Sequence, residues 1–379
     1  MLKNRRFWLL FVILLLPVSV LTASYLQDYF RSPELYRTGK EPLDLAVGDL
    51  NHDNYLDVVT ANRGGRSLSV FIGNSDGTLT FIQEVDIGLA ATSIAIADMN
   101  LDDNLDVVAS VCNYGCTKNE IHIYHGQGDG KLVFAEKHNV SGVPYHIFVR
   151  DFDQDEFPDI AATDASEHRI VLLLSNQNSD AFSISYLPTG QRPISLAVGD
   201  INADGFLDLC TANQWDDTVT LFLGLGEGSF STPQTIVTED LPYAVSIADI
   251  NGDTIEDLMV AHSSDPGQVI TYLGNEQGEL ERYEVLPAIG RLIFVYAEDF
   301  NLDGKRDIAV THKSTQNIHV YLNENDSFAQ TELLSIPTVH EIFSLLIADL
   351  NDDDYPDLLT VEFNQAILSV ALGKDPEGY

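Results

Sequence analysis

Basic side chains are scarce in this sequence: 20 Lys and Arg residues stand against 58 Asp and Glu residues, which gives a formal net charge of −38. So acidic a chain repels phosphate backbones, and this excludes nucleic acid as a partner. The acidic excess predicts bound cations, unless it serves only to keep the surface soluble. The apolar fraction of 45% allows a sizeable core and argues against disorder.

Cysteine is rare, and familiar catalytic motifs are missing. Three cysteines are too few for disulfides to hold a secreted chain of this length together. Cys112 and Cys116 are close enough to staple one loop, whereas Cys210 lies in an apolar stretch that predicts a buried thiol. There is no Gly-x-Ser-x-Gly elbow, no His-Glu-x-x-His helix and no phosphate-binding loop. We therefore expect a protein that is not an enzyme, and a carbohydrate-active lyase or hydrolase with a scattered site is the alternative.

Long hydrophobic runs are absent except at the N-terminus. The run from Phe7 to Leu21 follows Lys3, Arg5 and Arg6, and it is short for a membrane span of about 20 residues. This pattern predicts a secretory signal peptide, and an uncleaved signal anchor is the alternative because Leu21 is a poor match to a cleavage site. In either case we expect a protein that is secreted or displayed on the cell surface, with the membrane reached only through that anchor.

Helical periodicity is absent beyond this leader, and a nine-residue pattern recurs instead. The pattern is Asp-x-Asn/Asp-x-Asp-x-x-x-Asp, and seven copies start at intervals of 49 to 53 residues. An apolar strand precedes each copy, a short strand follows it, a third strand ends in a turn, and a more polar fourth strand leads on. Four strands in each period of about 50 residues predict an all-β, seven-bladed β-propeller of four-stranded blades.

The two ends of the repeat region predict a closed ring. The last unit stops after its third strand at residues 367–373, whereas residues 30–50 align without gaps with residues 230–250. Residues 34–38 therefore resemble a fourth strand that lacks a blade, and we expect it to complete the last blade, which removes two open sheet edges. An open solenoid is the alternative, and it gives this strand no role. The expected division is a signal peptide or anchor at 1–23, a linker at 24–29, the propeller at 30–373 and a tail at 374–379, in a monomer.

Each copy of the nine-residue pattern, called here an aspartate loop and numbered one to seven, predicts a calcium site. Oxygen-bearing side chains at positions 1, 3, 5 and 9 and the carbonyl at position 7 suit an ion that takes six to eight oxygen ligands. The alternative is that the Asp residues only cap turns, but clusters of three or four carboxylates repel one another unless a cation lies between them. We expect up to seven Ca²⁺ ions. The predicted ligands are Asp49, Asn51, Asp53, Asp57, Asp98, Asn100, Asp102, Asp106, Asp151, Asp153, Asp155, Asp159, Asp200, Asn202, Asp204, Asp208, Asp249, Asn251, Asp253, Asp257, Asp299, Asn301, Asp303, Asp307, Asp349, Asn351, Asp353 and Asp357.

A sharp turn is required at position 6 of each aspartate loop. Gly205 and Gly304 suit such a turn, and Asn or Asp at this position tolerates the left-handed conformation. Glu156 and Thr254 fit poorly, and we therefore expect loops three and five to be distorted.

The blades resemble FG-GAP/VCBS repeats and are similar to the N-terminal propeller of integrin α subunits. The aspartate loops carry this resemblance over residues 30–373, together with the turns FIGNSDGTL at 71–79 and FLGLGEGSF at 222–230. The Phe-Gly-x-Gly-Ala-Pro signature is absent, so the sequence is closer to the VCBS branch. The resemblance implies a propeller with calcium at the matched positions, and often cell adhesion or ligand binding, but it does not imply a particular ligand.

The strand order predicts that the aspartate loops share one face and that the remaining links share the opposite face. Loops on a rigid scaffold often carry function, and Trp or Tyr can stack on a sugar or anchor a protein, although inter-blade packing is the alternative for each aromatic residue. His262 and His312 occupy equivalent positions in adjacent blades, which would suit either a convergent pair or ordinary rim residues. We expect an extracellular protein or carbohydrate ligand. The candidate residues of this face are Arg63, Arg66, Tyr145, Arg192, Trp215, Tyr243, His262, Arg291, His312 and Glu362.

Overall fold

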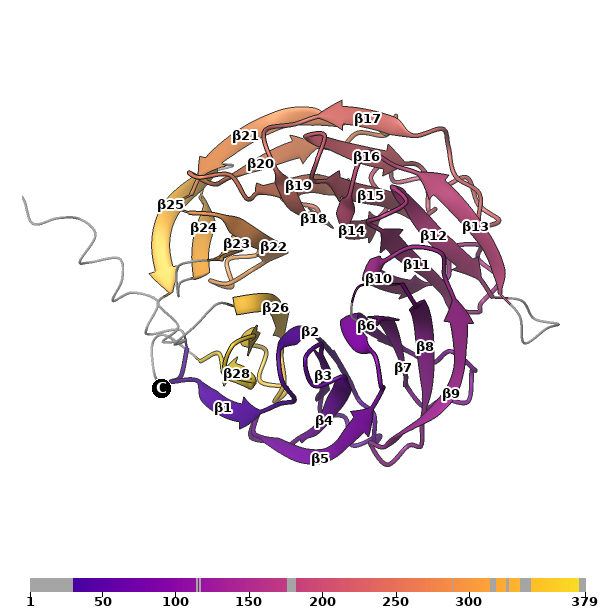
Figure 1. The fold of residues 1–379 in the computed structure, drawn as a ribbon. Coiled ribbons are helices and arrows are strands. Elements are labelled where there is room, and N and C mark those ends of the chain that lie inside the picture. The colour runs from indigo at the N-terminus through magenta and orange to yellow at the C-terminus, as the bar shows by residue number, and fades with distance from the viewer. Residues whose placement is uncertain are drawn as a thin grey trace, which may run out of the picture.

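A computed structural model describes residues 30–113, 115, 117–175, 182–288, 290–313, 318–324, 327–334 and 342–374. These residues form seven four-stranded antiparallel sheets that are arranged as blades around a central axis (Figure 1). The predicted all-β, seven-bladed propeller is therefore confirmed. The predicted signal segment and linker lie outside the described residues, as does most of the predicted tail. Over the ranges given above, the chain contains no helix that could cross a membrane.

The two inner strands of every blade flank an aspartate loop. The innermost strand leads into the loop, and the seven innermost strands are β2 (Pro42–Gly48), β6 (Ala90–Ala97), β10 (Pro144–Arg150), β14 (Pro193–Gly199), β18 (Pro242–Ala248), β22 (Leu292–Glu298) and β26 (Ile342–Ala348). The second strand starts at the ninth residue of the loop, and these strands are β3 (Asp57–Asn62), β7 (Asp106–Cys112), β11 (Asp159–Asp164), β15 (Asp208–Asn213), β19 (Asp257–His262), β23 (Asp307–His312) and β27 (Asp357–Glu362).

The two outer strands complete each blade. The third strands are β4 (Ser67–Gly73), β8 (Asn119–Gly126), β12 (Arg169–Leu174), β16 (Thr218–Phe222), β20 (Gln268–Leu273), β24 (Ile318–Glu324) and β28 (Ile367–Ala371). The outermost strands are β5 (Leu79–Asp86), β9 (Leu132–Asn139), β13 (Ser183–Pro188), β17 (Gln234–Val237), β21 (Glu281–Pro287), β25 (Ser327–Leu334) and, for the last blade, β1 (Glu34–Arg37). Figure 1 shows these strands at the periphery of the ring.

How deeply a strand is buried depends on its position in the blade. Every residue of the seven second strands is buried, because both faces of these strands pack against neighbouring blades. Outermost strands such as β13 and β17 are mostly exposed, as expected of a sheet edge in contact with water. The polar fourth strand of each repeat is thus explained by its place at the rim.

The hydrophobic core is divided among the interfaces between blades. Leu68 and Val70 of the first blade pack with Val107 and Val111 of the second, and equivalent clusters lie between the other neighbouring blades. Cys210 is fully buried in one of these clusters, as predicted. Cys112 is buried at the end of β7, whereas Cys116 lies outside the described residues, so the predicted staple stays a prediction.

The ring closes through the N-terminal strand. Strand β1 pairs antiparallel with β28, and Glu34 lies opposite Val370. The backbone N–H of Arg31 donates to the carbonyl of Leu372 at 2.8 Å, and that of Thr38 donates to Ala366 at 3.0 Å. A further apolar cluster joins the last blade to the first blade. The predicted closure is therefore confirmed.

Candidate functional site

The seven aspartate loops share one backbone conformation. The fourth residue of each loop has a φ between 56° and 78°, and the sixth residue has a φ between 66° and 88°. Two left-handed residues so close together coil the chain tightly, and this coiling turns the alternate side chains at positions 1, 3 and 5 toward the inside of the loop.

Hydrogen bonds to the backbone fix these side chains. The Asp at position 1 accepts the N–H of position 6 at 2.7–2.9 Å in all seven loops. The Asp at position 5 accepts the N–H of position 7 at 2.8–3.0 Å. In the six loops with Asn at position 3, its Nδ2 donates to the position-5 carboxylate at 2.8–3.2 Å. These hydrogen bonds hold the carboxylates of positions 1 and 5 in place within each loop.

Loops three and five respond differently to their poorly suited sixth residues. Glu156 adopts a φ of 76°, and loop three keeps the hydrogen bonds of the other loops, so the expected distortion of loop three is wrong. Loop five deviates at its fourth residue, because the N–H of Gly252 donates to Asp249 at 2.7 Å where the other loops use the N–H of position 5. Thr254 nevertheless adopts a φ of 74°.

The Asp at position 9 ties each loop to its blade. One carboxylate oxygen accepts the N–H of position 2 at 2.8–3.1 Å. The other oxygen accepts an N–H from the end of the third strand or just beyond it at 2.7–3.0 Å. Burial raises the pKa of this carboxyl in all seven loops, to about 6 in five of them and to about 7 at Asp208. A cation beside the carboxylate would favour its ionised form.

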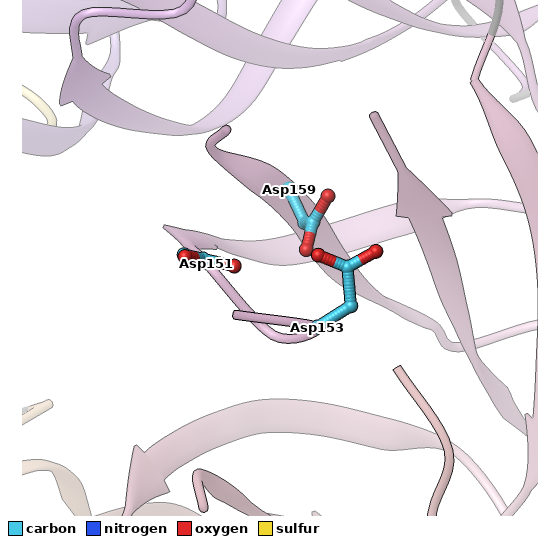
Figure 2. Close-up of side chains that lie close together, drawn as sticks. All are labelled: Asp151, Asp153 and Asp159. Carbon is cyan, nitrogen blue, oxygen red and sulfur yellow. The ribbon is translucent and has the colours of Figure 1, made fainter. Parts of the chain in front are cut away.

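The donor set of the loops fits a hard cation. Figure 2 shows loop three, where carboxylate oxygens of Asp151, Asp153 and Asp159 lie within 4.8 Å of one another. In loop seven the buried Oδ1 of Asn351, at a predicted ligand position, accepts no hydrogen bond. A buried oxygen without a donor is costly, and a metal ion would satisfy it. The predicted ligand positions of the seven loops hold 22 of the 58 acidic residues.

The predicted residues of the opposite face divide by burial. Arg63, Arg66, Trp215 and Arg291 are exposed, and Tyr145, Arg192 and Tyr243 are partly buried. The other three, His262, His312 and Glu362, are buried because each is the last residue of a second strand and pairs with the start of the innermost strand. These three therefore do not belong to an exposed surface.

The two predicted histidines do not converge. The ring of His262 lies 2.9 Å from the Thr238 hydroxyl, and burial lowers its pKa to about 4. The ring of His312 lies 3.0 Å from His319 of its own blade. The structure thus gives each histidine a separate set of contacts.

Two of the predicted face residues, Trp215 and Arg291, line one open groove, and Arg192 lies beside Trp215. Trp215 is 61% exposed, and the Arg192 guanidinium lies 5.0 Å from the centre of its ring. Arg192 also donates to Gln214 at 2.5 Å. The groove has a volume of about 520 Å³, whereas the predicted Tyr243 lines a different cavity in the central channel. The lining residues of the groove are Gln214, Trp215, Asp217, Asp240, Leu241, Ser263, Ser264, Asp265 and Arg291.

Sequence reasoning missed the residues that line the central channel. Asp44, His146, Phe294 and Phe343 face a cavity there, together with the predicted Tyr145 and Tyr243. These residues stand five or six positions before the first Asp of an aspartate loop, and their residue types vary so much between the repeats that the sequence pattern gives no signal for them.

A family model for FG-GAP-like repeats matches residues 32–109, 151–211, 200–260, 249–310 and 299–360, which together make up more than half of the chain. The chain belongs to the FG-GAP-like repeat family. The resemblance indicated by the aspartate loops is therefore confirmed. No curated protein matches this FG-GAP-like chain by sequence.

Solved structures share the fold of these FG-GAP-like repeats at low sequence identity. BBS1N, crystallised in complex with ARL6DN, gives a TM-score of 0.64 at 15% identity, over 91% of this chain and 97% of that chain. A candidate 6-phosphogluconolactonase from Bacteroides uniformis gives 0.59 at 16%, over 76% and 83%. A functionally unknown protein from Desulfotomaculum acetoxidans gives 0.56 at 11%, over 78% and 86%. At such identities the likeness shows the fold alone.

Proposed function

We propose that this protein is an exported, calcium-binding propeller that acts outside the cell as a ligand-binding or adhesion module. The observation that carries the proposal is the groove around Trp215, which lies on the face opposite the aspartate loops. One face would hold metal ions that stiffen the ring, and the other would meet the ligand.

The aspartate loops support the calcium part of this proposal. In loop one the ion would be held by Asp49, Asn51, Asp53 and Asp57, and the other loops offer the same positions. Bound calcium would neutralise the clustered carboxylates and link the innermost strand to the second strand. Extracellular calcium sites typically bind at about 10⁻⁴ to 10⁻³ M, which suits a chain whose leader predicts export.

The surroundings of Trp215 favour a carbohydrate over a protein. An indole that is 61% exposed offers a flat apolar surface for a sugar ring. Asp217, Asp240 and Arg291 lie around it, and these charged side chains form directional hydrogen bonds with hydroxyl groups. Protein interfaces instead tend to bury a larger central cluster of apolar side chains.

The test is a glycan array together with a panel of soluble extracellular proteins, both probed in calcium. Trp215→Ala should weaken binding at least about tenfold, because exposed aromatic anchors dominate such contacts. The matched control is Tyr186→Ala, which removes another exposed aromatic ring that lies 4.0 Å from an arginine, but at the outer rim of the third blade. Both variants should melt close to the wild type. A Trp215→Ala variant that binds as well as the wild type would overturn the proposal.

Polysaccharides that contain the glycans of the array are tested for cleavage by the protein as well as for binding to it. Retention without cleavage supports a binding module. Cleavage that survives in Trp215→Ala would favour the alternative of a carbohydrate-active enzyme with its site elsewhere on this face.

A further inference from the structure

The innermost strands enclose a cavity of about 80 Å³ at the end of the central channel opposite the aspartate loops. Every blade contributes two consecutive residues to its wall. The outer tier stands six positions before each loop and consists of Leu43, Thr92, Tyr145, Ile194, Tyr243, Ile293 and Phe343. The inner tier stands five positions before each loop and consists of Asp44, Ser93, His146, Ser195, Ala244, Phe294 and Ser344.

A bulge in each innermost strand allows two neighbouring residues to face the channel. Consecutive side chains of a regular strand point to opposite faces. All seven innermost strands, however, have a register shift at this point, as between Pro42 and Asp44 in β2. A bulge redirects a side chain, and bulges are common beside functional sites.

Polar residues of the inner tier accept backbone N–H groups of the next blade. The Ser93 hydroxyl accepts from Ile147 at 3.3 Å, and the Ser195 hydroxyl accepts from Val245 at 3.2 Å. Nδ1 of His146 accepts from Leu196 at 3.0 Å. The wall of the cavity is therefore fixed in place before any ligand binds.

Asp44 gives the cavity its charge. It is the one carboxylate among the lining residues, all of which are described, and burial lowers the pKa of His146 so that this imidazole is neutral at pH 7. One oxygen of Asp44 accepts from the Ser93 hydroxyl at 2.7 Å and the Ile94 N–H at 3.1 Å. The other accepts from the Leu45 N–H at 3.0 Å and the Ser344 hydroxyl at 3.1 Å.

These four hydrogen bonds decide what kind of cation suits the cavity. A carboxylate has about four acceptor positions, and four donors already occupy those of Asp44. Asp44 therefore offers a negative charge but no spare acceptor. A primary ammonium group would leave N–H donors unsatisfied beside it, whereas a methylated ammonium group has few or none to satisfy.

Aromatic rings supply the remaining contacts. Tyr145, Tyr243, Phe294 and Phe343 line the cavity from four different positions in the ring of blades. The Phe343 ring packs against Phe363 with centroids 4.7 Å apart, and burial, together with the neighbouring Tyr145, raises the pKa of Tyr243. Aromatic faces carry partial negative charge and attract cations, most strongly where water is excluded.

We propose that the channel cavity binds a quaternary or methylated ammonium group, carried either by a small molecule or by a methylated lysine of a peptide. The net charge of −38 raises the local concentration of such cations. Arg192 interacts electrostatically with Tyr243, but it does not line the cavity. Its guanidinium lies over the Trp215 ring instead, so it does not occupy the place of the proposed cation. The cavity is separate from the Trp215 groove, so this inference does not depend on the groove binding a ligand.

The test compares three small molecules by calorimetric titration into the full-length protein in saturating calcium. Choline carries the quaternary group, 3,3-dimethyl-1-butanol has the same shape without charge, and ethanolamine carries a primary ammonium. Choline should bind about tenfold more tightly than either of the others. A peptide with trimethyl-lysine, compared with its unmodified form, shows whether the group comes from a small molecule or a peptide.

Variants link the binding to the cavity. Phe343→Leu keeps an apolar side chain but removes a ring, so the preference for choline over its neutral isostere should fall several-fold. Phe81→Leu makes the same change at a ring that is 52% exposed on the outermost strand β5, and it should leave that preference unchanged. Asp44→Asn should abolish the preference, and if that variant unfolds, Phe343→Leu still decides the matter. Equal affinity for the three small molecules, or no binding of choline and of the trimethyl-lysine peptide to folded protein, would overturn the proposal.

Discussion

The backbone conformation at the sixth position of the aspartate loops disfavours β-branched side chains. Position 6 is left-handed in all seven loops, and Asn54, Gly205 and Gly304 adopt this conformation at little cost. Thr254 has a φ of 74° although it is β-branched, and such a residue is a steric outlier there. The strain is tolerated because the Thr254 N–H donates to Asp249 at 2.8 Å, as the equivalent N–H does in the other loops.

Exchanging Asn and Thr between two loops tests this strain. Thr254→Asn should raise the free energy of unfolding by about 1 kcal/mol, because a left-handed residue with a Cβ costs about 1–2 kcal/mol and Asn tolerates this region better. The reciprocal change Asn54→Thr should lower it by a similar amount. Urea denaturation at fixed calcium measures both. An Asn54→Thr variant as stable as the wild type would show that position 6 is not strained.

The residues of the aspartate loops were easier to predict than those of the channel. Equivalent positions in the seven repeats keep the same residue types in the loops, but they differ in residue type along the channel. The aspartate loops keep the same chemistry seven times, so the spacing alone indicates the ligands. The column five residues before each loop changes from Asp44 to Ser93, His146 and Phe294, and no pattern of residue type identifies it. The sequence also does not indicate that His262 is buried, because its position beside a turn resembles that of an exposed link, whereas in the structure it pairs with Pro242.

At the scale of the element, the most informative strand is β1, which belongs in sequence to the first blade and in space to the last. Its alignment with a fourth strand predicted this exchange, and the pairing of Tyr36 with Leu368 bears it out. The Tyr36 hydroxyl also accepts the N–H of Leu79 in the first blade at 3.1 Å, and its ring meets Phe71 with centroids 6.2 Å apart. Strand β1 therefore joins both sides of the closure.

Removing residues 24–38 should lower stability markedly, because β28 loses its partner and the first blade loses the Tyr36 contacts. The exposed edge of β28 should also pair with other molecules, so the truncated protein should associate as its concentration rises. Thermal melting and sedimentation velocity measure the two effects. A synthetic peptide of residues 28–40 should restore the melting temperature in part. A truncated protein that is monomeric and equally stable would contradict the closure.

The bulges of the innermost strands show what a pattern of alternating residues cannot predict. A regular alternation would place Tyr145 and His146 on opposite faces, whereas the shift between Pro144 and Ile147 brings both to the channel. Bulges depend on how a strand packs against its neighbours as well as on its own residues. The fold was therefore predictable from the repeats, and the shape of the cavity was not.

At the scale of the molecule, the core of the described residues is divided among the interfaces between blades, so each blade depends on its neighbours for burial. The aspartate loops add electrostatic repulsion, because 22 of the 58 acidic residues occupy the predicted ligand positions on one face. Like charges held this close oppose folding unless cations lie among them. Stability should therefore depend on calcium across the whole ring.

Calcium removal should lower the melting temperature strongly, because the ion would bind the folded loops and not the unfolded chain. Each filled site contributes about 0.4 to 1.4 kcal/mol when calcium is one to ten times the dissociation constant, so seven sites supply several kcal/mol against the roughly 5–15 kcal/mol of a typical domain. Magnesium should restore little, because it demands a tighter octahedral shell. Asp204→Ala should remove about one ion from the stoichiometry measured by equilibrium dialysis, whereas the control Glu276→Ala, an exposed acid outside the loops, should remove none. Identical melting curves in millimolar calcium and in excess chelator would refute the assignment of the loops as metal sites.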